Sequence, residues 1–278
     1  MTDSHTGTDT TLPIQIDTTV AHEARVYDYW LGGKDNYSAD RALGDAIAGH
    51  IPTIKLMARA NRAFLARSVR YLVADAGITQ FLDIGTGIPT AGNTHEVAQR
   101  LDPAARIVYV DKDPIVLAHA RALMTSDPVG STRFIHADLH DPGSILDHPA
   151  LTETLDLAQP VAIMLVAIMM YFRDTDHPRE IINTLLEAVP SGSHLVISHP
   201  TADFDADAMA AVTASAEASG ITFQPRSHAD TTALFGSTHL VEPGLAPVAA
   251  WRPDLTDEPT LVHDAHSAWY WAGIGRKP

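Results

Sequence analysis

The chain has 278 residues and a formal net charge of −15, because 34 Asp and Glu outnumber 19 Lys and Arg. Such a surface repels phosphate backbones, so we expect no nucleic-acid partner. The absence of cysteine excludes disulfides, thiolate nucleophiles and zinc–thiolate sites, and it suits a reducing compartment.

The first 76 residues predict a polar segment followed by a helical cap. Residues 1–16 are polar and lack periodicity, so we expect them to be disordered. We expect residues 17–76 to form the cap, with helices over residues 20–31, 40–49 and 53–76. The N-terminus has no basic run followed by an apolar one and is therefore not a signal peptide.

Residues 77–278 alternate between strand and helix patterns, which predicts an α/β domain with a mostly parallel sheet and helices on both faces. Seven strands are expected, over residues 80–84, 106–110, 132–136, 161–168, 194–198, 239–242 and 269–275. Helices are expected over residues 93–101, 114–124, 143–147, 177–189, 205–219 and 228–235. The longest uncharged apolar stretch, Val161–Phe172, is too short to cross a bilayer, so we expect a cytoplasmic protein without a membrane partner.

A glycine turn ends the first predicted strand. Asp83 lies near the end of that strand, and Gly85, Thr86 and Gly87 follow. Glycines let the backbone turn tightly and approach a ligand closely. The third glycine of a dinucleotide fingerprint would be residue 90, which is Thr90, so the turn suits a nucleoside without phosphates.

Acidic residues follow the next two strands. Asp111 ends the second strand 24 residues after Gly87 (111 − 87), where its carboxylate can accept hydrogen bonds from both hydroxyls of a ribose, and Lys112 follows it. Asp138 follows the third strand, where it can accept a hydrogen bond from an adenine amino group, with Leu139 against the ring. S-adenosylmethionine is the common cofactor of this kind.

An alternative interpretation treats each of these features alone. Gly85 and Gly87 would then form an ordinary strand-to-helix turn, and the two aspartates would cap helices. Short glycine motifs recur by chance. The agreement of three strand ends in order and spacing favours the cofactor site, because consistency across levels is what a real site requires.

Several segments resemble an actinobacterial family of S-adenosylmethionine-dependent methyltransferases. The N-terminal block Ala24–Tyr37, which reads Tyr-Asp-Tyr-Trp-Leu-Gly-Gly-Lys-Asp-Asn-Tyr from Tyr27, carries the most specific part of the resemblance. The other similar segments are Arg59–Leu65, Phe81–Thr90, Gly92–Glu96, Tyr109–Asp111, Leu240–Gly244 and Ala272–Pro278. The resemblance implies a Rossmann-like class I methyltransferase fold with a seven-stranded sheet, and S-adenosylmethionine as cofactor.

Candidate residues for the chemistry lie at the carboxyl ends of strands and in the N-terminal block. His199 is a candidate general base because its ordinary pKa lies near neutrality, and Tyr171 is a second catalytic candidate. A hydrogen-bonded structural histidine is the alternative for His199. Candidate acceptor contacts are Trp30, Asn93 and Met170, and candidate cofactor contacts beyond the glycines and aspartates are Asn36 and Tyr37.

Two further sets of side chains are arginines and histidines. Arg25, Arg59 and Arg62 are candidate partners for the methionine carboxylate. We expect no metal site, because His136 and His140 lie beside aspartates in no recognised ligand spacing.

The predicted function is methyl transfer to a small molecule. The alternative is a protein that binds S-adenosylmethionine without methylating, and the sequence leaves the oligomeric state open.

Overall fold

The computed structural model describes residues 17–89, 92–116, 129–255 and 264–278. The segment predicted to be disordered, residues 1–16, lies outside the described residues. So does most of the helix predicted over residues 114–124, of which Pro114–Val116 are helical.

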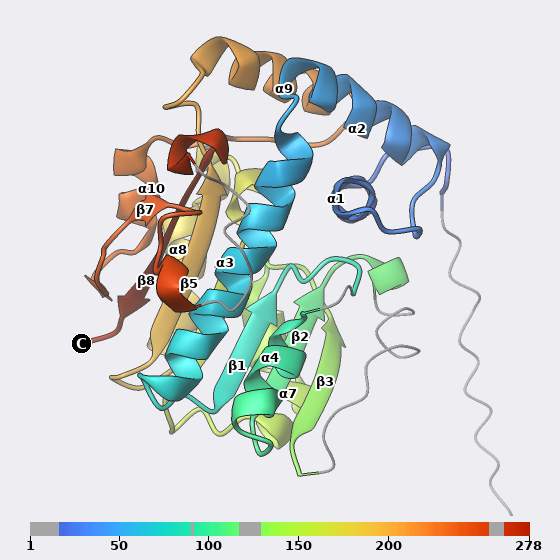
Figure 1. The fold of residues 1–278 in the computed structure, drawn as a ribbon. Coiled ribbons are helices and arrows are strands. Elements are labelled where there is room, and N and C mark those ends of the chain that lie inside the picture. Colours follow the sequence, from blue (N-terminus) through green and yellow to red (C-terminus); the bar gives the residue numbers. More distant parts are fainter. Residues whose placement is uncertain (1–16, 90–91, 117–128, 256–263) are drawn as a thin grey trace, which may run out of the picture.

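One mixed sheet forms the centre of the protein (Figure 1). Its order is β3-β2-β1-β4-β5-β8-β6, with β7 paired to β8. The first five strands of this order are parallel, whereas β8 runs antiparallel to β5, β6 and β7. The bounds are β1 (Gln80–Ile84), β2 (Arg106–Asp111), β3 (Ser131–His136), β4 (Ala162–Val166), β5 (His194–Pro200), β6 (His239–Leu240), β7 (Ala246–Pro247) and β8 (Tyr270–Arg276).

All seven predicted strands are confirmed, and they are the seven strands of the order β3-β2-β1-β4-β5-β8-β6. The eighth, β7, has two residues and contains Pro247, so it carries little strand pattern. The α/β class and the mostly parallel sheet with helices on both faces are confirmed as well.

Side chains alternate between the two faces of the sheet, because successive strand residues point in opposite directions. Phe81 and Ile107 join an apolar core on one face, whereas their neighbours Leu82 and Val108 join a second core on the other. All four side chains are at most 1% exposed. The central strands are therefore apolar throughout, as the sequence pattern of β4 predicts.

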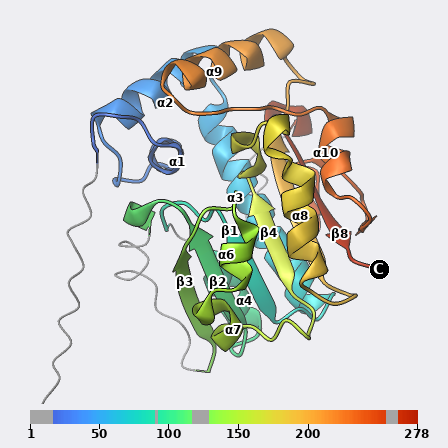
Figure 2. The same cartoon turned by 180° about the vertical axis from the view of Figure 1, so that it is seen from behind.

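Helices cover both faces. The first face carries α3 (Ile54–Ala74) and α4 (Thr94–Leu101). The second carries α6 (Pro142–Leu146), α7 (Pro149–Thr154), α8 (Pro178–Glu187) and α10 (His228–Leu234), as Figure 2 shows. Short 3-10 turns complete the described elements at η1 (Met169–Tyr171), η2 (Asp174–Asp176), η3 (Pro253–Leu255) and η4 (Ala265–Ser267).

Three helices form a roof over the carboxyl ends of the parallel strands: α1 (Glu23–Leu31), α2 (Ser38–His50) and α9 (Ala206–Ala218). Both views show α2 and α9 side by side, although they are far apart in the sequence (Figures 1 and 2). Below this roof α3 descends along the sheet, and Phe64 of α3 lies in the same core as Phe81 of β1. The cap predicted over residues 17–76 therefore shares its core with the sheet.

A buried ion pair ties the start of α1 to the start of α2. Arg25 Nε donates to Asp40 Oδ1 at 3.1 Å, and both side chains are at most 4% exposed. The Asp40 carboxylate also accepts the backbone N–H groups of His22 and Tyr37. Asp40 thus fixes how α1 lies on α2.

None of the helices in the described ranges is both long and apolar enough to cross a membrane.

Candidate functional site

A cavity opens at the carboxyl ends of β1, β2, β3 and β4. The connections from β1 and from β4 lead to opposite sides of the sheet, and ligands of open α/β sheets bind at such a switch point. The cavity holds about 1040 Å³ of unfilled space, including its open mouth. Eight predicted cofactor residues line it, namely Asp83, Gly85, Thr86, Gly87, Asp111, Lys112, Asp138 and Leu139.

The glycine turn forms the floor of the cavity. Gly85 has a φ of +74°, and a side chain there would collide with Ile168. Gly87 has a φ of +63° and open space where a Cβ would lie. Glycine is therefore needed at both positions, but for different reasons. At Gly85 it allows close packing on Ile168, and at Gly87 it leaves room for a ligand.

Asp111 holds the glycine turn against β2. Its Oδ2 accepts the backbone N–H of Gly87 at 2.9 Å, and its Oδ1 accepts that of Asp113 at 2.9 Å. Burial raises the pKa of Asp111, although these two hydrogen bonds oppose the rise. The carboxylate therefore lines the cavity and also orders the loop that a ligand would approach.

Asp83 lies deeper, where β1 ends. It is 5% exposed, and its Oδ2 accepts the Thr94 hydroxyl at 2.6 Å. Burial raises the pKa of Asp83 to about 6, despite the opposing effects of Thr94 and Arg62. This carboxyl can therefore change its protonation near neutral pH.

The third strand contributes the outer wall. Asp138 Oδ1 lies 2.7 Å from His140 Nδ1 and accepts the His140 backbone N–H. Burial opposes ionisation of Asp138, but the His140 contacts outweigh it and lower the pKa below the ordinary value. Leu139 is 4% exposed and presents an apolar surface beside this carboxylate.

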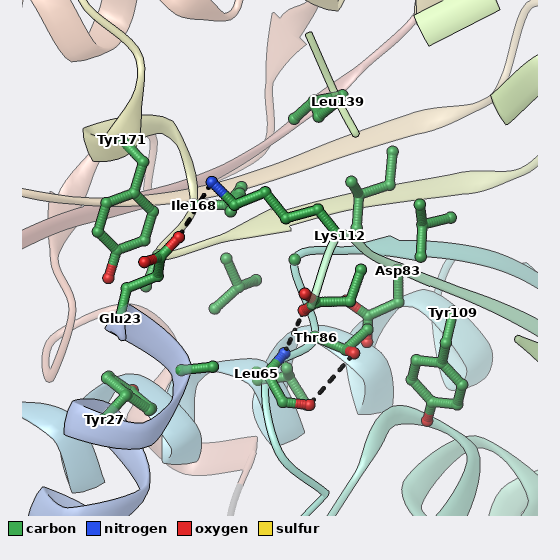
Figure 3. Close-up of a pocket in the computed structure, with 18 of the residues that line it drawn as sticks. Glu23, Tyr27, Leu65, Asp83, Thr86, Tyr109, Lys112, Leu139, Ile168 and Tyr171 are labelled. Atoms are coloured by element: carbon green, nitrogen blue, oxygen red, sulfur yellow. Dashed lines mark hydrogen bonds and ion pairs between the residues drawn. The ribbon is translucent and has the colours of Figure 1, made fainter. Parts of the chain in front are cut away.

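The start of α1 closes the cavity from above. Lys112 Nζ lies 3.1 Å from Glu23 Oε1, so an ion pair spans from β2 to the roof (Figure 3). Burial opposes ionisation of Glu23, but the charges of His22 and Lys112 outweigh it and lower the pKa of Glu23. Figure 3 also shows Tyr171 near this carboxylate.

A chain of hydrogen bonds positions Tyr27 in the cavity wall. Asn61 Nδ2 donates to the Tyr27 hydroxyl at 2.9 Å, and that hydroxyl donates to Ala58 O at 3.1 Å. Asn61 Oδ1 in turn accepts the Ser198 hydroxyl, whose oxygen accepts the backbone N–H of Ala167. The network joins α1, α3, β5 and the end of β4.

A second cavity lies beside the first, with about 570 Å³ of unfilled space including its opening. The two cavities share Glu23, Tyr27 and Tyr171 in their walls. The second is otherwise lined mainly by apolar side chains of α1, α2, α3 and α9, and by Phe223 and Tyr270. Of the predicted acceptor contacts, Trp30 and Met170 line the second cavity and Asn93 lines the first, and the catalytic candidate Tyr171 lines both.

The geometry does not bring His199 to either cavity. It is 0% exposed, Nδ1 lies 2.9 Å from Pro200 O, and Nε2 lies 2.9 Å from Arg226 Nη1. Because Arg226 can only donate, Nε2 is an acceptor and the ring is neutral. Burial lowers the pKa of His199 to about 4. The predicted general base is therefore a structural histidine that helps Arg226 hold the loop after β4, including Met169 O.

Asn36 and Tyr37 also lie outside the first cavity. The Asn36 side chain donates to Asp28 Oδ2 at 2.8 Å and to Gly33 O at 3.1 Å. Gly33 packs so closely on Asp28 that a side chain would overlap the carboxylate. The segment after α1 is thus a compact turn around Asp28, and Tyr37 is the exposed N-cap of α2.

Other cavity residues carried no separate signal in the sequence analysis. Glu23 was missed, although it lies one helical turn before Tyr27 on the same face of α1. Of the three arginines, Arg62 lines the cavity, whereas Arg25 pairs with Asp40 and Arg59 is exposed. Within the described ranges, no three His, Cys, Asp or Glu side chains gather as metal ligands would.

The residues present fit a cationic nucleoside. Gly87 leaves open space at the floor, and the wall carries four carboxylates (Glu23, Asp83, Asp111 and Asp138) against the permanent cations Arg62 and Lys112. An excess of negative charge favours a sulfonium over the phosphates of a dinucleotide.

Comparison with known proteins shows the family of the chain. The chain matches the S-adenosyl methyltransferase family model over residues 9–278. It is 43% identical to a DUF574 family protein from Streptomyces avermitilis MA-4680, with a TM-score of 0.91, and the match covers 95% of this chain and 100% of that one. A provisionally assigned methyltransferase from Thermobifida fusca YX is 40% identical, with a TM-score of 0.84 and coverage of 94% and 96%.

More distant similarity shows the fold alone. The plantazolicin methyltransferase BpumL, solved in complex with S-adenosylhomocysteine, is 14% identical with a TM-score of 0.50, and the match covers 92% of this chain and 95% of that one. Among curated proteins, no sequence matches this one. With a family model spanning almost its whole length, the chain belongs to the S-adenosyl methyltransferase family and is an S-adenosylmethionine-dependent methyltransferase of the Rossmann-like class I fold.

Proposed function

We propose that the protein methylates a small molecule rather than a protein or a nucleic acid. The observation that carries this proposal is the second cavity, which shares three side chains with the first and is walled by helices of the roof. A small molecule can be enclosed between α1, α2 and α9, whereas a folded protein or a duplex cannot. The net charge of −15 also argues against nucleic acid.

In this proposal the cofactor contacts come from predicted residues that line the first cavity, and Asn36 and Tyr37 are not among them. Gly87 lets the backbone approach the cofactor, Gly85 lets the turn pack on Ile168, and Asp111 accepts the ribose hydroxyls. Asp138 and Leu139 hold the adenine through a hydrogen bond and apolar contact. S-adenosylmethionine, when bound, supplies a methyl group activated by its sulfonium charge.

The charged groups at the inner end of the cavity orient the rest of the cofactor. Arg62 attracts the methionine carboxylate, and Asp83 attracts the amino group. Lys112 holds Glu23 ionised beside the acceptor, because their charges lie 3.1 Å apart. Orientation of two reactants accounts for a large part of catalysis when the nucleophile needs little activation.

In this proposal Tyr171 and Met170 lie at the acceptor end of the site, where His199 was predicted to lie. Burial raises the pKa of Tyr171 well above its ordinary value, so its hydroxyl stays neutral and acts as a hydrogen-bond donor. Trp30 and Met170 supply apolar surface in the second cavity.

A labelling experiment tests the proposed function. The protein is incubated with methyl-labelled S-adenosylmethionine and an actinobacterial cell extract, and small molecules are then separated from macromolecules. We expect the label in the small-molecule fraction, and much less of it with Asp111→Ala. Label in protein or nucleic acid would contradict the proposed acceptor class. Absence of any transfer by protein that binds the cofactor would support the non-methylating alternative.

A further inference from the structure

We infer that the second cavity binds an uncharged, apolar molecule that presents one hydroxyl group, such as a phenol, to Glu23 and Tyr171. This inference rests on the proposed function and specifies the acceptor that it leaves open. Three properties of the cavity wall support it: its apolar lining, its charge and its unpaired hydroxyls.

The apolar lining selects the body of the ligand. Val212 and Ala216 of α9 line the cavity together with Leu43 and Ile47 of α2. Methionine side chains contribute flexible, polarisable surface, at Met57, Met170 and Met209. Methionines of this kind adapt to aromatic rings and make favourable sulfur–ring contacts. A space of about 570 Å³ lies within the roughly 300–1,000 Å³ of small-molecule sites.

The charge of the wall excludes anions. Glu23 is the only charged side chain among the described residues that line this cavity, and its pKa is lowered by His22 and Lys112 despite burial. Lys112 lies on the side of the first cavity and does not line the second. A carboxylate or phosphate on the ligand would therefore lose its hydration and meet a like charge.

Two hydroxyls are available to a ligand. In the described part of the chain, the Tyr171 and Tyr270 hydroxyls have no hydrogen-bond partner, and both residues line this cavity. Burial raises the pKa of both phenols, so both stay neutral donors. The Tyr27 hydroxyl, by contrast, already donates to Ala58 O.

The Tyr171 hydroxyl, a donor, and the Glu23 carboxylate, an acceptor, therefore both lie in the wall that the two cavities share. A ligand hydroxyl can accept a hydrogen bond from Tyr171 and donate one to the Glu23 carboxylate, and it is the simplest group that does both while staying uncharged. The same contacts place the nucleophilic oxygen next to the first cavity.

The test uses 2-naphthol as the probe and 2-naphthoate as an anion of similar size and shape, titrated into the full-length protein by calorimetry. We expect 2-naphthol to bind one-to-one and at least tenfold more tightly than 2-naphthoate. Ala216→Phe, which fills the cavity, should weaken 2-naphthol binding at least tenfold. Ala214→Phe, on the exposed face of the same helix, should leave it unchanged.

Tyr171→Phe keeps the ring and removes only the hydroxyl, so it serves if Ala216→Phe fails to fold. It should weaken 2-naphthol roughly 2- to 12-fold, as expected for one neutral hydrogen bond. Equal binding of both probes, or unchanged binding in Ala216→Phe and Tyr171→Phe, would overturn the inference. A parallel titration with S-adenosylhomocysteine separates this outcome from failure of the proposed function, because Ala216→Phe should not change cofactor affinity.

Discussion

Asp111 has two roles, one toward the ligand site and one toward the backbone around it. Its carboxylate faces the cavity, and both of its oxygens also accept backbone N–H groups of neighbouring loops. A residue at a strand end can thus bind a ligand and shape the loop around it. The same arrangement explains why a single aspartate there is informative in the sequence.

Asp111→Ala should weaken binding of S-adenosylhomocysteine by about 1.5–3 kcal/mol, the range for hydrogen bonds to a charged group. Calorimetric titration measures this change. Asp102→Ala is the matched control, because Asp102 Oδ1 accepts the backbone N–H two residues later, as Asp111 does, but it precedes β2 and does not line the cavity. Affinity equal to wild type in Asp111→Ala would refute the ribose assignment.

Asp83 makes stability depend on pH in an unusual direction. Burial raises its folded-state pKa to about 6 from an ordinary 3.8, so the folded protein binds this proton more tightly than the unfolded chain. The contribution of Asp83 to the free energy of unfolding therefore falls as pH rises from about 4 to about 6. His194 and His199, whose pKa values burial lowers to about 4, act oppositely in the same range.

The difference between Asp83→Asn and wild type isolates this contribution. Asn keeps an oxygen that can accept the Thr94 hydroxyl, so the packing is retained. We expect the variant to gain stability over wild type as pH rises, by up to about 3 kcal/mol above pH 6, with no gain near pH 4. Urea unfolding at a series of pH values measures it. A difference that is constant across pH would contradict the raised pKa.

At the scale of elements, the roof is held by a few buried polar contacts as well as by apolar packing. Arg25 and Asp40 join α1 to α2, and the turn around Asp28 fixes the segment between them. Because α1 carries Glu23 and Tyr27, these contacts decide where the cavity walls lie.

Asp40→Ala should destabilise the fold by about 3–5 kcal/mol, because it leaves the Arg25 guanidinium buried without its partner. Asp45→Ala is the control, since Asp45 accepts the Tyr29 hydroxyl at the surface, and it should cost at most about 1 kcal/mol. Denaturant unfolding gives both values. Equal effects of the two substitutions would show that the ion pair does not hold the roof.

The sequence predicted the sheet well because each strand carries a local signal. All seven strands of the main order, and the helices between them within the described ranges other than α7, follow from hydrophobic period and from turn residues. The exception among strands is β7, whose two residues form a strand only because they pair with β8. The short helix α7 was missed for a similar reason, since six residues beginning with Pro149 carry little period.

The sequence predicted those site residues whose position follows from the backbone topology. It did not predict those whose position depends on packing between residues distant in sequence. The glycine turn and the aspartates at strand ends all line the cavity, because topology alone brings them together. His199 has the expected strand-end position, yet its ring turns toward Arg226, which is distant in sequence. No local pattern in the sequence shows that Arg226 covers this histidine, or that Glu23 reaches Lys112.

At the scale of the whole molecule, the central claim is that one cavity at the carboxyl ends of the strands binds S-adenosylmethionine beneath the roof. Hydrogen exchange of the full-length protein, with and without saturating S-adenosylhomocysteine, tests it most directly, because ligand binding slows local opening. We expect protection in residues 22–27, 83–87, 111–113 and 138–140, and none with NAD. Protection confined to another surface, such as that around Asp174 and Arg226, or no protection at saturation, would contradict the account.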